Sequence, residues 1–461
     1  MYNVQCTKYE VTKDKGQRTM NEKIENKEQL AWLWVPTLYF AEGVPYFLVN
    51  QISVAMFTTL GVANDSMAFF TSLIYLPWVI KPFWAPFVDL IKTKRIWIIS
   101  MEALIAITMI LTLISIPHPE PEAILTMTTP VKLFYLTLIW FVIMAFASAT
   151  HDIAADGFYM LALSPKRQAE MIGWRSVFYR LSNVFCNSAL VAIPGIVVTK
   201  GYQMTTGWQV TMAVAAVIYI LITIWHFFTA PKPIDDRPAT NTSAKEIARG
   251  FIDAFYTFFS KKGIVLALCF MLLYRLPEAF LVKMEAPFLL GSADQGGMDM
   301  PLQTYGVVYG VIGVCFLLLG GILGGRYISR VGLKRSLWWM AAAITLPDLA
   351  FVYLSVCRPT NIALIASAIA IEQMGYGFGF TAYMMYLVFF SEGEYKTTHY
   401  ALCTGFMALS MMLPGMAAGK LQLMLGYRKF FVFVIACCTL TLIVTYFVRR
   451  QVDEDYGRST K

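Results

Sequence analysis

Apolar runs long enough to cross a membrane recur along almost the whole chain. A bilayer core requires about 20 consecutive, mainly apolar residues per helix. The sequence therefore predicts an all-α membrane protein with twelve transmembrane helices. The twelve runs are 31–58, 67–91, 96–116, 132–162, 171–199, 208–230, 263–290, 303–325, 336–357, 361–390, 400–425 and 429–449.

Composition excludes several other classes of protein. Of the 461 residues, 57% are hydrophobic and only 14% are charged, against about 25% charged residues in typical soluble domains. This balance excludes an ordinary cytosolic enzyme, a disordered protein and a small secreted domain. The net charge of +8 comes from residues dispersed over short loops, so no nucleic-acid partner is expected. The eight cysteines show no metal-ligand spacing, and we expect neither a metal site nor a cofactor.

The distribution of Lys and Arg sets the expected orientation. Basic residues concentrate in alternate loops, such as 92–95, 166–167 and 326–335, and such loops usually face the cytoplasm. The polar segment 1–30 has no signal peptide. We therefore expect a multi-pass protein of the cell inner (cytoplasmic) membrane, surrounded by lipid, with both termini cytoplasmic. A monomer is expected.

One long polar break divides the apolar runs six and six. It contains aromatic residues at helical spacing, which predicts an amphipathic helix on the inner membrane face. The expected organisation is a cytoplasmic N-terminal tail (1–30), a six-helix half (31–230), a cytoplasmic connector (231–262), a second six-helix half (263–450) and a cytoplasmic C-terminal tail (451–461).

Two charged loops occupy equivalent places in the two halves. GGILGGRYISRVGLKR (320–335) resembles the loop signature of the major facilitator superfamily, and DLIKTKR (89–95) stands at the matching point of the first half. Each loop alone is also explained by the inward bias of positive charge. We interpret both as conformational-switch loops, with candidate residues Asp89, Lys94, Arg95, Gly325, Arg330, Gly332, Lys334 and Arg335.

Ionisable residues inside the predicted spans are numerous. Each costs about 2.5–3.5 kcal/mol at the bilayer centre on insertion scales, so a large set predicts a polar cavity between the halves. The set is Glu42, Lys81, Glu102, His151, Asp152, Asp156, Arg175, Arg180, Arg275, Glu278, Asp348 and Glu372. From it we select nine candidates for substrate binding or coupling: Glu42, Lys81, His151, Asp152, Asp156, Arg175, Arg180, Arg275 and Glu278.

The candidates suggest particular pairs. Asp152 and Asp156 share one helix face because they lie four residues apart, and at least one should pair with Arg175 or Arg180. Either this is a clamp within one half, or its partners exchange during transport.

Other pairs follow from depth or spacing. Lys81 is expected to pair with Glu42, and Arg275 with Glu278. His151, whose unperturbed pKa lies near neutrality, is either a proton carrier or a hydrogen-bonded spacer. Lys283 and Glu285 lie near the outer end of their span and are expected to snorkel, so they receive no role.

Three stretches of the first half resemble one branch of the superfamily. SATHDIAADGFY (148–159), FYRLSNV (178–184) and IKPFWAPFVD (80–89) are similar to motifs of AmpG-type muropeptide permeases and the related acetyl-coenzyme A transporters. The residues that match the motifs are Lys81, Asp89, Asp152, Asp156 and Arg180. His151 stands where that family usually has Gln.

The resemblance implies a secondary transporter that imports anhydromuropeptides with protons for cell-wall recycling. Its partners would be a small anionic substrate and protons. Arg residues provide fork-shaped donors for carboxylates, but they suit another bulky anion, such as a coenzyme A thioester, equally well. A non-transporting membrane sensor is a further alternative. The sequence shows no catalytic or ATP-binding motif, so no enzyme is expected.

Overall fold

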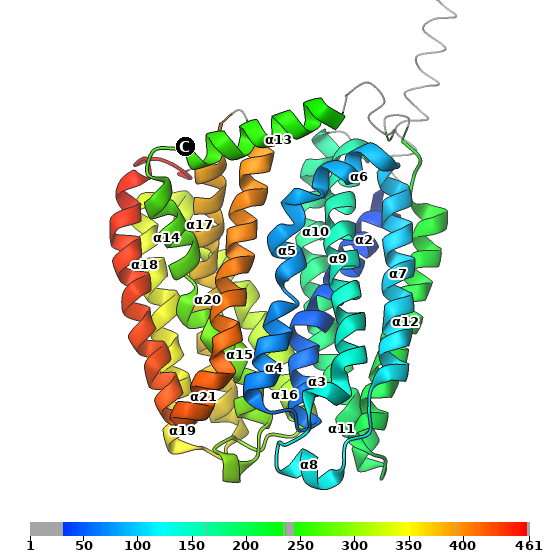
Figure 1. The fold of residues 1–461 in the computed structure, drawn as a ribbon. Helices are drawn as coiled ribbons and strands as arrows, with labels where there is room; N and C mark the ends of the chain where they lie inside the picture. The colour runs from blue at the N-terminus through cyan, green and yellow to red at the C-terminus, as the bar shows by residue number, and fades with distance from the viewer. Residues whose placement is uncertain (1–30, 164, 234–235, 237–243, 394, 459–461) are drawn as a thin grey trace, which may run out of the picture.

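The computed structural model describes residues 31–163, 165–233, 236, 244–393 and 395–458, and over these residues it consists of helices and loops without a β-strand (Figure 1). The predicted tail 1–30 lies outside the described residues. Among the described residues, nine helical segments are long and apolar enough to cross a membrane. One of them, Thr398–Gln451, crosses twice, because it reverses at Gly426, where φ is 70°. Eight single crossings, this double crossing and two initial passes built from shorter pieces make twelve, which confirms the predicted fold class.

The helices that precede 230 form what we call the N-terminal bundle, drawn in blue to green at the right of Figure 1. Its elements are α2 (Ala31–Phe47), η1 (Leu48–Ile52), α3 (Ser53–Thr59), α4 (Asn64–Leu73), α5 (Leu76–Ile80), η2 (Lys81–Phe83), α6 (Ala85–Ile91), α7 (Lys94–Ser115), α8 (Pro121–Leu125), η3 (Val131–Phe134), α9 (Tyr135–Ala162), α10 (Pro165–Val184), η4 (Phe185–Leu190), α11 (Val191–Thr199) and α12 (Met204–Thr229).

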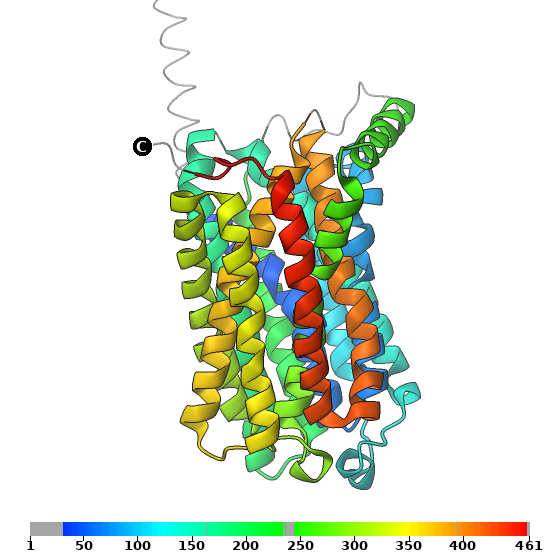
Figure 2. The ribbon, with the colours of Figure 1, turned by 90° about the vertical axis from the view of Figure 1, so that its left-hand side faces the viewer.

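The helices that follow 263 form the C-terminal bundle, which faces the viewer in Figure 2. Its elements are α14 (Ile264–Leu273), α15 (Leu276–Leu290), η5 (Ala293–Gln295), α16 (Leu302–Tyr305), η6 (Gly306–Gly313), α17 (Val314–Val331), α18 (Leu333–Thr345), η7 (Leu346–Asp348), α19 (Leu349–Cys357), α20 (Ile362–Ser391), α21 (Lys396–Val448) and η8 (Arg449–Gln451). Between the bundles in sequence, α13 (Ala244–Phe259) lies across one end of the molecule (Figure 1). We call that end the α13 end and the opposite one the α8 end.

Several passes are interrupted where the sequence removes a backbone donor. Proline lacks an N–H and clashes with the preceding turn, and Pro82 lies in the 3₁₀ turn η2 that divides the second pass. The seventh pass is divided between α14 and α15, and Pro277 occupies the first turn of α15. Such breaks turn the side chains on either side of them to new directions. Both of these breaks lie beside charged residues of the candidate site, Lys81 and Arg275.

The two bundles meet closely at the α8 end. The Asn64 side-chain amide, at the start of α4, donates to Gln422 Oε1 (2.8 Å) and to Tyr427 Oη (2.9 Å) of α21. Gly419 of α21 packs directly on the Asn64 backbone carbonyl, where a Cβ would collide. In the same way, Gly310 of η6 packs on the backbone of Asn187 in η4. Small residues permit this approach of helices, and the structure is closed at this end.

At the α13 end, the connecting helix contacts both bundles. The ring of Phe255 lies 5.5 Å from that of Phe83 in the N-terminal bundle. Phe258 packs edge-on against Phe390 of α20, with ring centroids 5.7 Å apart. Just after the helix, Lys261 Nζ donates to the backbone carbonyls of Phe390 (2.5 Å) and Glu392 (2.8 Å). Ala254 and Phe258 of α13 are therefore buried against the ends of other helices, while Ile252, Tyr256 and Phe259 stay exposed.

Candidate functional site

Four charged side chains of the N-terminal bundle form two ion pairs, which we call the N-bundle charge cluster (Lys81, Asp152, Asp156 and Arg175). Lys81 Nζ lies 2.5 Å from Asp152 Oδ2, and Arg175 Nη2 lies 2.7 Å from Asp156 Oδ1. The two aspartates project from one face of α9, as their spacing predicted. The expected pairing of this aspartate pair with Arg175 or Arg180 is confirmed by Asp156 and Arg175. The side chains are 20–42% exposed, so both pairs are accessible to solvent.

Tyr39 of α2 contacts both members of the pair formed by Asp156 and Arg175. Its hydroxyl donates to Asp156 Oδ1 at 3.1 Å, and the Arg175 guanidinium lies 4.3 Å from the centre of its ring. A cation over an aromatic face is attracted by the ring quadrupole. Arg175 is therefore positioned by a carboxylate and by an aromatic ring at once, and Tyr39 itself is only 1% exposed.

The predicted pair of Lys81 with Glu42 is wrong. Lys81 pairs with Asp152 instead, while Glu42 is 8% exposed and its Oε2 has no hydrogen-bond partner. Depth in the membrane was the basis for the prediction, but depth does not give the direction in which a side chain points around a helix. Glu42 still belongs to this region, because Asp152, Asp156 and Arg175 are its electrostatic neighbours.

Two guanidinium groups remain without a carboxylate. Within the part of the chain that the structure describes, neither Arg180 nor Arg275 has a carboxylate oxygen within 4.0 Å. The predicted pair of Arg275 with Glu278 is therefore not formed. Arg275 donates to Tyr376 Oη (2.6 Å) and lies over the Phe380 ring at 4.8 Å. Arg180 extends from α10 toward Gly321 of the opposite bundle.

His151 belongs to a separate buried network. Its Nε2 lies 3.2 Å from Glu102 Oε1, and His226 Nδ1 lies 2.6 Å from the same oxygen. His226 Nε2 in turn contacts Thr37 Oγ1 at 2.8 Å. His151, Glu102 and His226 are at most 1% exposed. The structure thus places His151 on a hydrogen-bonded link between α7, α9, α12 and α2, although it is adjacent in sequence to Asp152.

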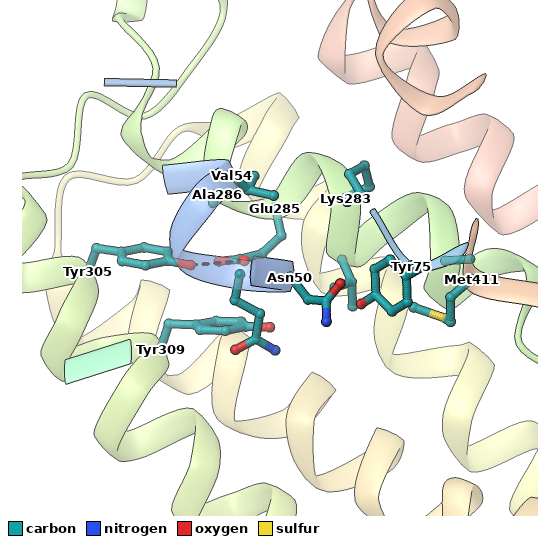
Figure 3. Close-up of a pocket in the computed structure, with 12 residues that line it drawn as sticks. Asn50, Val54, Tyr75, Lys283, Glu285, Ala286, Tyr305, Tyr309 and Met411 are labelled. Atoms are coloured by element: carbon teal, nitrogen blue, oxygen red, sulfur yellow. Dashed lines mark hydrogen bonds between the residues drawn. The ribbon is translucent and has the colours of Figure 1, made fainter. Parts of the chain in front are cut away.

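A small cavity lies between the two bundles and is lined by residues of both. Figure 3 shows polar groups from both bundles around it, with Glu285 between Tyr305 and Asn50, and with Lys283 near Tyr75. The lining residues come from α3, η1, α15, α16, η6, α21 and the α4–α5 break, so both bundles contribute.

Lys283 and Glu285 are the charged residues of this cavity, and the expectation that they snorkel outward is wrong. Lys283 is 5% exposed and donates to Thr71 Oγ1 at 3.1 Å, while its ammonium lies 5.7 Å from the centre of the Tyr75 ring. Glu285 is 2% exposed and accepts from Tyr305 Oη at 3.3 Å. Glu285 Oε1 and Asn50 Oδ1 are buried without a hydrogen-bond partner. The sequence signal that could have identified them as cavity residues is the presence of a Lys and a Glu inside an otherwise apolar run.

Aromatic side chains line the same interface. Tyr46 packs edge-on against Trp78 (5.2 Å between ring centroids), and Phe47 lies 5.5 Å from Tyr179. Tyr305 and Tyr309 stack in parallel at 5.5 Å, as Figure 3 shows. Trp174, in contrast, is 44% exposed and contacts Trp32 at the α13 end. Tyr46, Trp78 and Tyr179 therefore form one aromatic cluster, because Tyr46 contacts both of the others.

The switch loops lie at the α13 end. The backbone N–H groups of Lys94 and Arg95 donate to the carboxylate of Asp236 (2.7 and 3.1 Å), which thus caps the start of α7. Arg95 also donates to the carbonyls of Ala230 and Phe227. Of the other candidates, the Asp89 side chain lies outside the described residues, and Gly325, Arg330 and Arg335 are exposed.

The second switch loop is covered by the C-terminal tail. Leu333 N–H donates to the Tyr456 carbonyl (2.8 Å), next to Gly332, whose φ is 85°. Lys334 Nζ lies 3.7 Å from Glu454 Oε1. Tyr456 Oη donates to Glu392 Oε1 at 3.1 Å, and burial together with the charge of Glu392 raises the pKa of Tyr456 to about 12. The tyrosine thus keeps its proton and remains a donor at physiological pH.

Two bundles of membrane-spanning helices around a central polar cavity define a membrane transporter. A family model described as the Major Facilitator Superfamily matches residues 37–413, and the chain belongs to this superfamily.

Curated relatives narrow the comparison. The chain is 26% identical to "Putative transporter AmpG 4" of Rickettsia felis over 412 residues, which are 88% of this chain and 90% of the relative. It is 23% identical to the "Anhydromuropeptide permease" of Escherichia coli K12 over 426 residues, or 90% of this chain and 79% of the relative. These similarities support the resemblance drawn from the sequence motifs.

Solved structures show the same fold. The crystal structure of a D-xylose-proton symporter superposes with a TM-score of 0.67 at 11% identity, covering 93% of this chain and 99% of that chain. The nucleoside transporter NupG gives a TM-score of 0.61 at 15% identity, covering 93% and 99%. The homologues and folds are those of transporters, not enzymes.

Proposed function

We propose that this protein imports anhydromuropeptides with protons across the bacterial inner membrane. The observation that carries the proposal is the cavity between the bundles, in which a cation, a carboxylate, amides and aromatic rings meet in one space. A sugar-peptide needs these groups: rings to pack on sugar faces, amides for hydroxyl and peptide groups, and charges for its carboxylates and amine. The similarity to a protein named anhydromuropeptide permease supports the same substrate.

The charges give each part a role in this proposal. Lys283 lines the cavity and has no carboxylate partner within 4.0 Å, so it is proposed to bind an anionic group of the substrate. Arg180 and Arg275 also lack such a partner and are proposed to take part once the cavity opens. The N-bundle charge cluster holds α9, α10 and the second pass together while its exposed pairs respond to solvent. Glu42 and Asp152 are the N-terminal carboxylates proposed to exchange protons.

Transport would proceed by alternating access of the two halves, 31–230 and 263–450, with 231–262 as their connector. The described conformation is closed at the α8 end, through Asn64, Gln422 and Tyr427. We propose that the α13 end is cytoplasmic, as the basic loops predict. In that orientation the closed side faces outward and the N-bundle charge cluster faces the cytoplasm.

Uptake into proteoliposomes tests the substrate. Purified protein is reconstituted, a proton gradient is imposed, and accumulation of radiolabelled GlcNAc-anhydroMurNAc-tripeptide is measured. We expect saturable uptake that a protonophore abolishes, and that Asp294→Asn, on an exposed loop, leaves unchanged. Accumulation of acetyl-coenzyme A in place of the muropeptide would favour the alternative anion. Binding without accumulation of either compound would favour a sensor.

Orientation is tested separately with single cysteines on a cysteine-free background. Lys262→Cys marks the α13 end and Asp294→Cys marks the α8 end. In intact cells, a membrane-impermeant maleimide should label Cys at position 294 and not at position 262. The reverse pattern would invert the proposed topology.

A further inference from the structure

Three carboxyl groups from three different elements meet inside the C-terminal bundle. Glu278 of α15, Asp348 of η7 and Glu372 of α20 each place a carboxylate oxygen within 4.8 Å of the others. Their side chains are 2%, 2% and 1% exposed. The sequence predicts all three as intramembrane acids but only Glu278 as a site residue, because positions on three separate elements give no sign in the sequence that they converge.

Most of the oxygens in this triad have no hydrogen-bond partner. Both oxygens of Glu278, Asp348 Oδ1 and Glu372 Oε1 are buried and unpartnered. The two remaining oxygens have weak or neutral donors: Cys438 Sγ lies 3.8 Å from Asp348 Oδ2, and Gln373 Nε2 donates to Glu372 Oε2 at 2.9 Å. A buried acceptor without a donor is costly, and the triad has four such oxygens, which a bound positive species would satisfy.

Arg275 attracts Glu278 electrostatically, but it forms no ion pair with the triad. In the described part of the chain, no Lys, Arg or His nitrogen lies within 4.0 Å of these three carboxylates. Arg275, one turn before Glu278, is held by Tyr376 and Phe380. The other titratable groups that face the triad are Glu285, Tyr309, Tyr376 and Cys438. None of them carries positive charge.

Three neighbouring carboxylates cannot all stay ionised in a low-dielectric interior without a counter-charge. Hard cations take carboxylate oxygens at about 2.3–2.6 Å, so two ligands of one ion lie no more than about 5 Å apart. The separations within the triad satisfy this limit. We propose that Glu278, Asp348 and Glu372 form a binding site for a small monovalent cation, Na⁺ or H⁺, in the C-terminal bundle. Binding there is independent of the proposed substrate, whereas a part in coupling rests on the proposed function.

Thermal unfolding of the purified full-length protein tests the site without any substrate. The melting temperature is measured in NaCl and in choline chloride at equal ionic strength, at alkaline and at mildly acidic pH. A cation that binds only the folded protein raises its stability by mass action. If Na⁺ is the occupant, NaCl raises Tm saturably by several degrees at alkaline pH, and the rise shrinks in acid, where protons compete.

A proton-only site gives a different pattern. NaCl and choline then give the same Tm, acidification raises Tm, and a pH dye detects no proton release when Na⁺ is added. With a Na⁺ site, the same addition releases protons into weak buffer. Either pattern supports the proposal, and the two identify the cation.

Isosteric variants assign the effect to the triad. Asp348→Asn and Glu372→Gln, made separately, should each reduce the cation-dependent Tm shift at least about fivefold, while Asp294→Asn keeps it. The proposal is overturned if the wild type responds to neither Na⁺ nor acid, or if both variants respond as the wild type does. Because muropeptide is absent, a negative result here leaves the uptake assay independent, and a failed uptake assay leaves this site intact.

Discussion

The two bundles differ in whether their acidic side chains have basic partners. In the N-terminal bundle, Asp152 and Asp156 have Lys81 and Arg175 as partners at 2.5 and 2.7 Å, and all four side chains are 20–42% exposed. In the C-terminal bundle, Glu278, Asp348 and Glu372 are at most 2% exposed and have no basic partner among the described residues. The first arrangement is electrically complete within the protein. The second is incomplete until something positive is added.

This difference indicates two roles: paired charges stabilise the contacts between helices, whereas unpaired acids respond to the concentration of cations. A paired charge is costly to disturb, because removing one partner leaves the other uncompensated. A cluster of ionised acids without a counter-charge is destabilising, so its charge should depend on the pH and on the cations in solution. In the N-bundle charge cluster each charge thus has a partner within the protein, whereas the charge of the C-terminal triad depends on what binds there. Matched substitutions in the two bundles should differ in sign.

The largest effect is expected from Lys81→Met. The change leaves Asp152 without its partner; breaking a fully buried pair costs about 3–5 kcal/mol, and the partial exposure of this pair places the expected loss at the lower end of that range. Folded yield and Tm should drop sharply, and uptake should be lost. The double variant Lys81→Met with Asp152→Asn should recover most of the stability, because both partners are neutral. If the double variant is as unstable as the single one, Lys81 stabilises through packing and not through charge.

Lys283→Met should separate stability from function. It removes a buried ammonium whose polar contact is the Thr71 hydroxyl, so unfolding free energy should rise by about 1–3 kcal/mol. Uptake should nevertheless fall about 10–100-fold, because a hydrogen bond to a charged group contributes about 1.5–3 kcal/mol. Chemical denaturation and proteoliposome uptake are compared on the same preparation. Unchanged uptake would remove Lys283 from the binding site.

Glu372→Gln should have the opposite sign to Asp152→Asn. At alkaline pH without Na⁺, loss of one charge from the triad relieves repulsion and should raise stability by about 1–2 kcal/mol, the scale of an unsatisfied buried group. Asp152→Asn, by contrast, strands Lys81 and should lower it. The Tm values of both variants, measured under the same conditions, show whether the two substitutions shift stability in opposite directions. Two shifts of the same sign would contradict the difference between the bundles.

The smallest effect is expected from His151→Gln. Glu102 keeps His226 as a partner at 2.6 Å, and a Gln amide can replace the His151 donor. Stability should fall by no more than about 1 kcal/mol, the net value of a typical hydrogen bond, and the pH dependence of uptake should be unchanged. A pH profile that shifts in the variant would make His151 a proton carrier after all.

The fold was accessible from the sequence because apolar runs report directly on membrane passes. The site was accessible only in part. Asp152 and Asp156 share a face by helical spacing, so their pairing with a nearby Arg could be foreseen. The partner of Lys81 could not, because the 3₁₀ turn at Pro82 redirects the side chain.

Lys283 was misplaced for a related reason. Counting residues from the end of its pass puts it near the surface, but the pass packs at the bundle interface, and both faces of the helix are covered there. The triad of Glu278, Asp348 and Glu372 depends on the packing of three elements, which no local pattern encodes. Sequence periodicity indicates how deep a residue lies in the membrane and on which face of its helix. Whether residues of different helices meet depends on the tertiary structure.

The tail that covers the second switch loop has a practical consequence for handling the protein. The chain beyond η8 is not a free end, since Tyr456 is bonded to both Leu333 and Glu392. An affinity tag or fluorescent reporter fused close behind residue 458 would disturb the contacts of the tail with α17, α18 and α20. It would thereby alter the conformational change that a transport assay measures. A cleavable tag preceding residue 31 leaves that junction untouched.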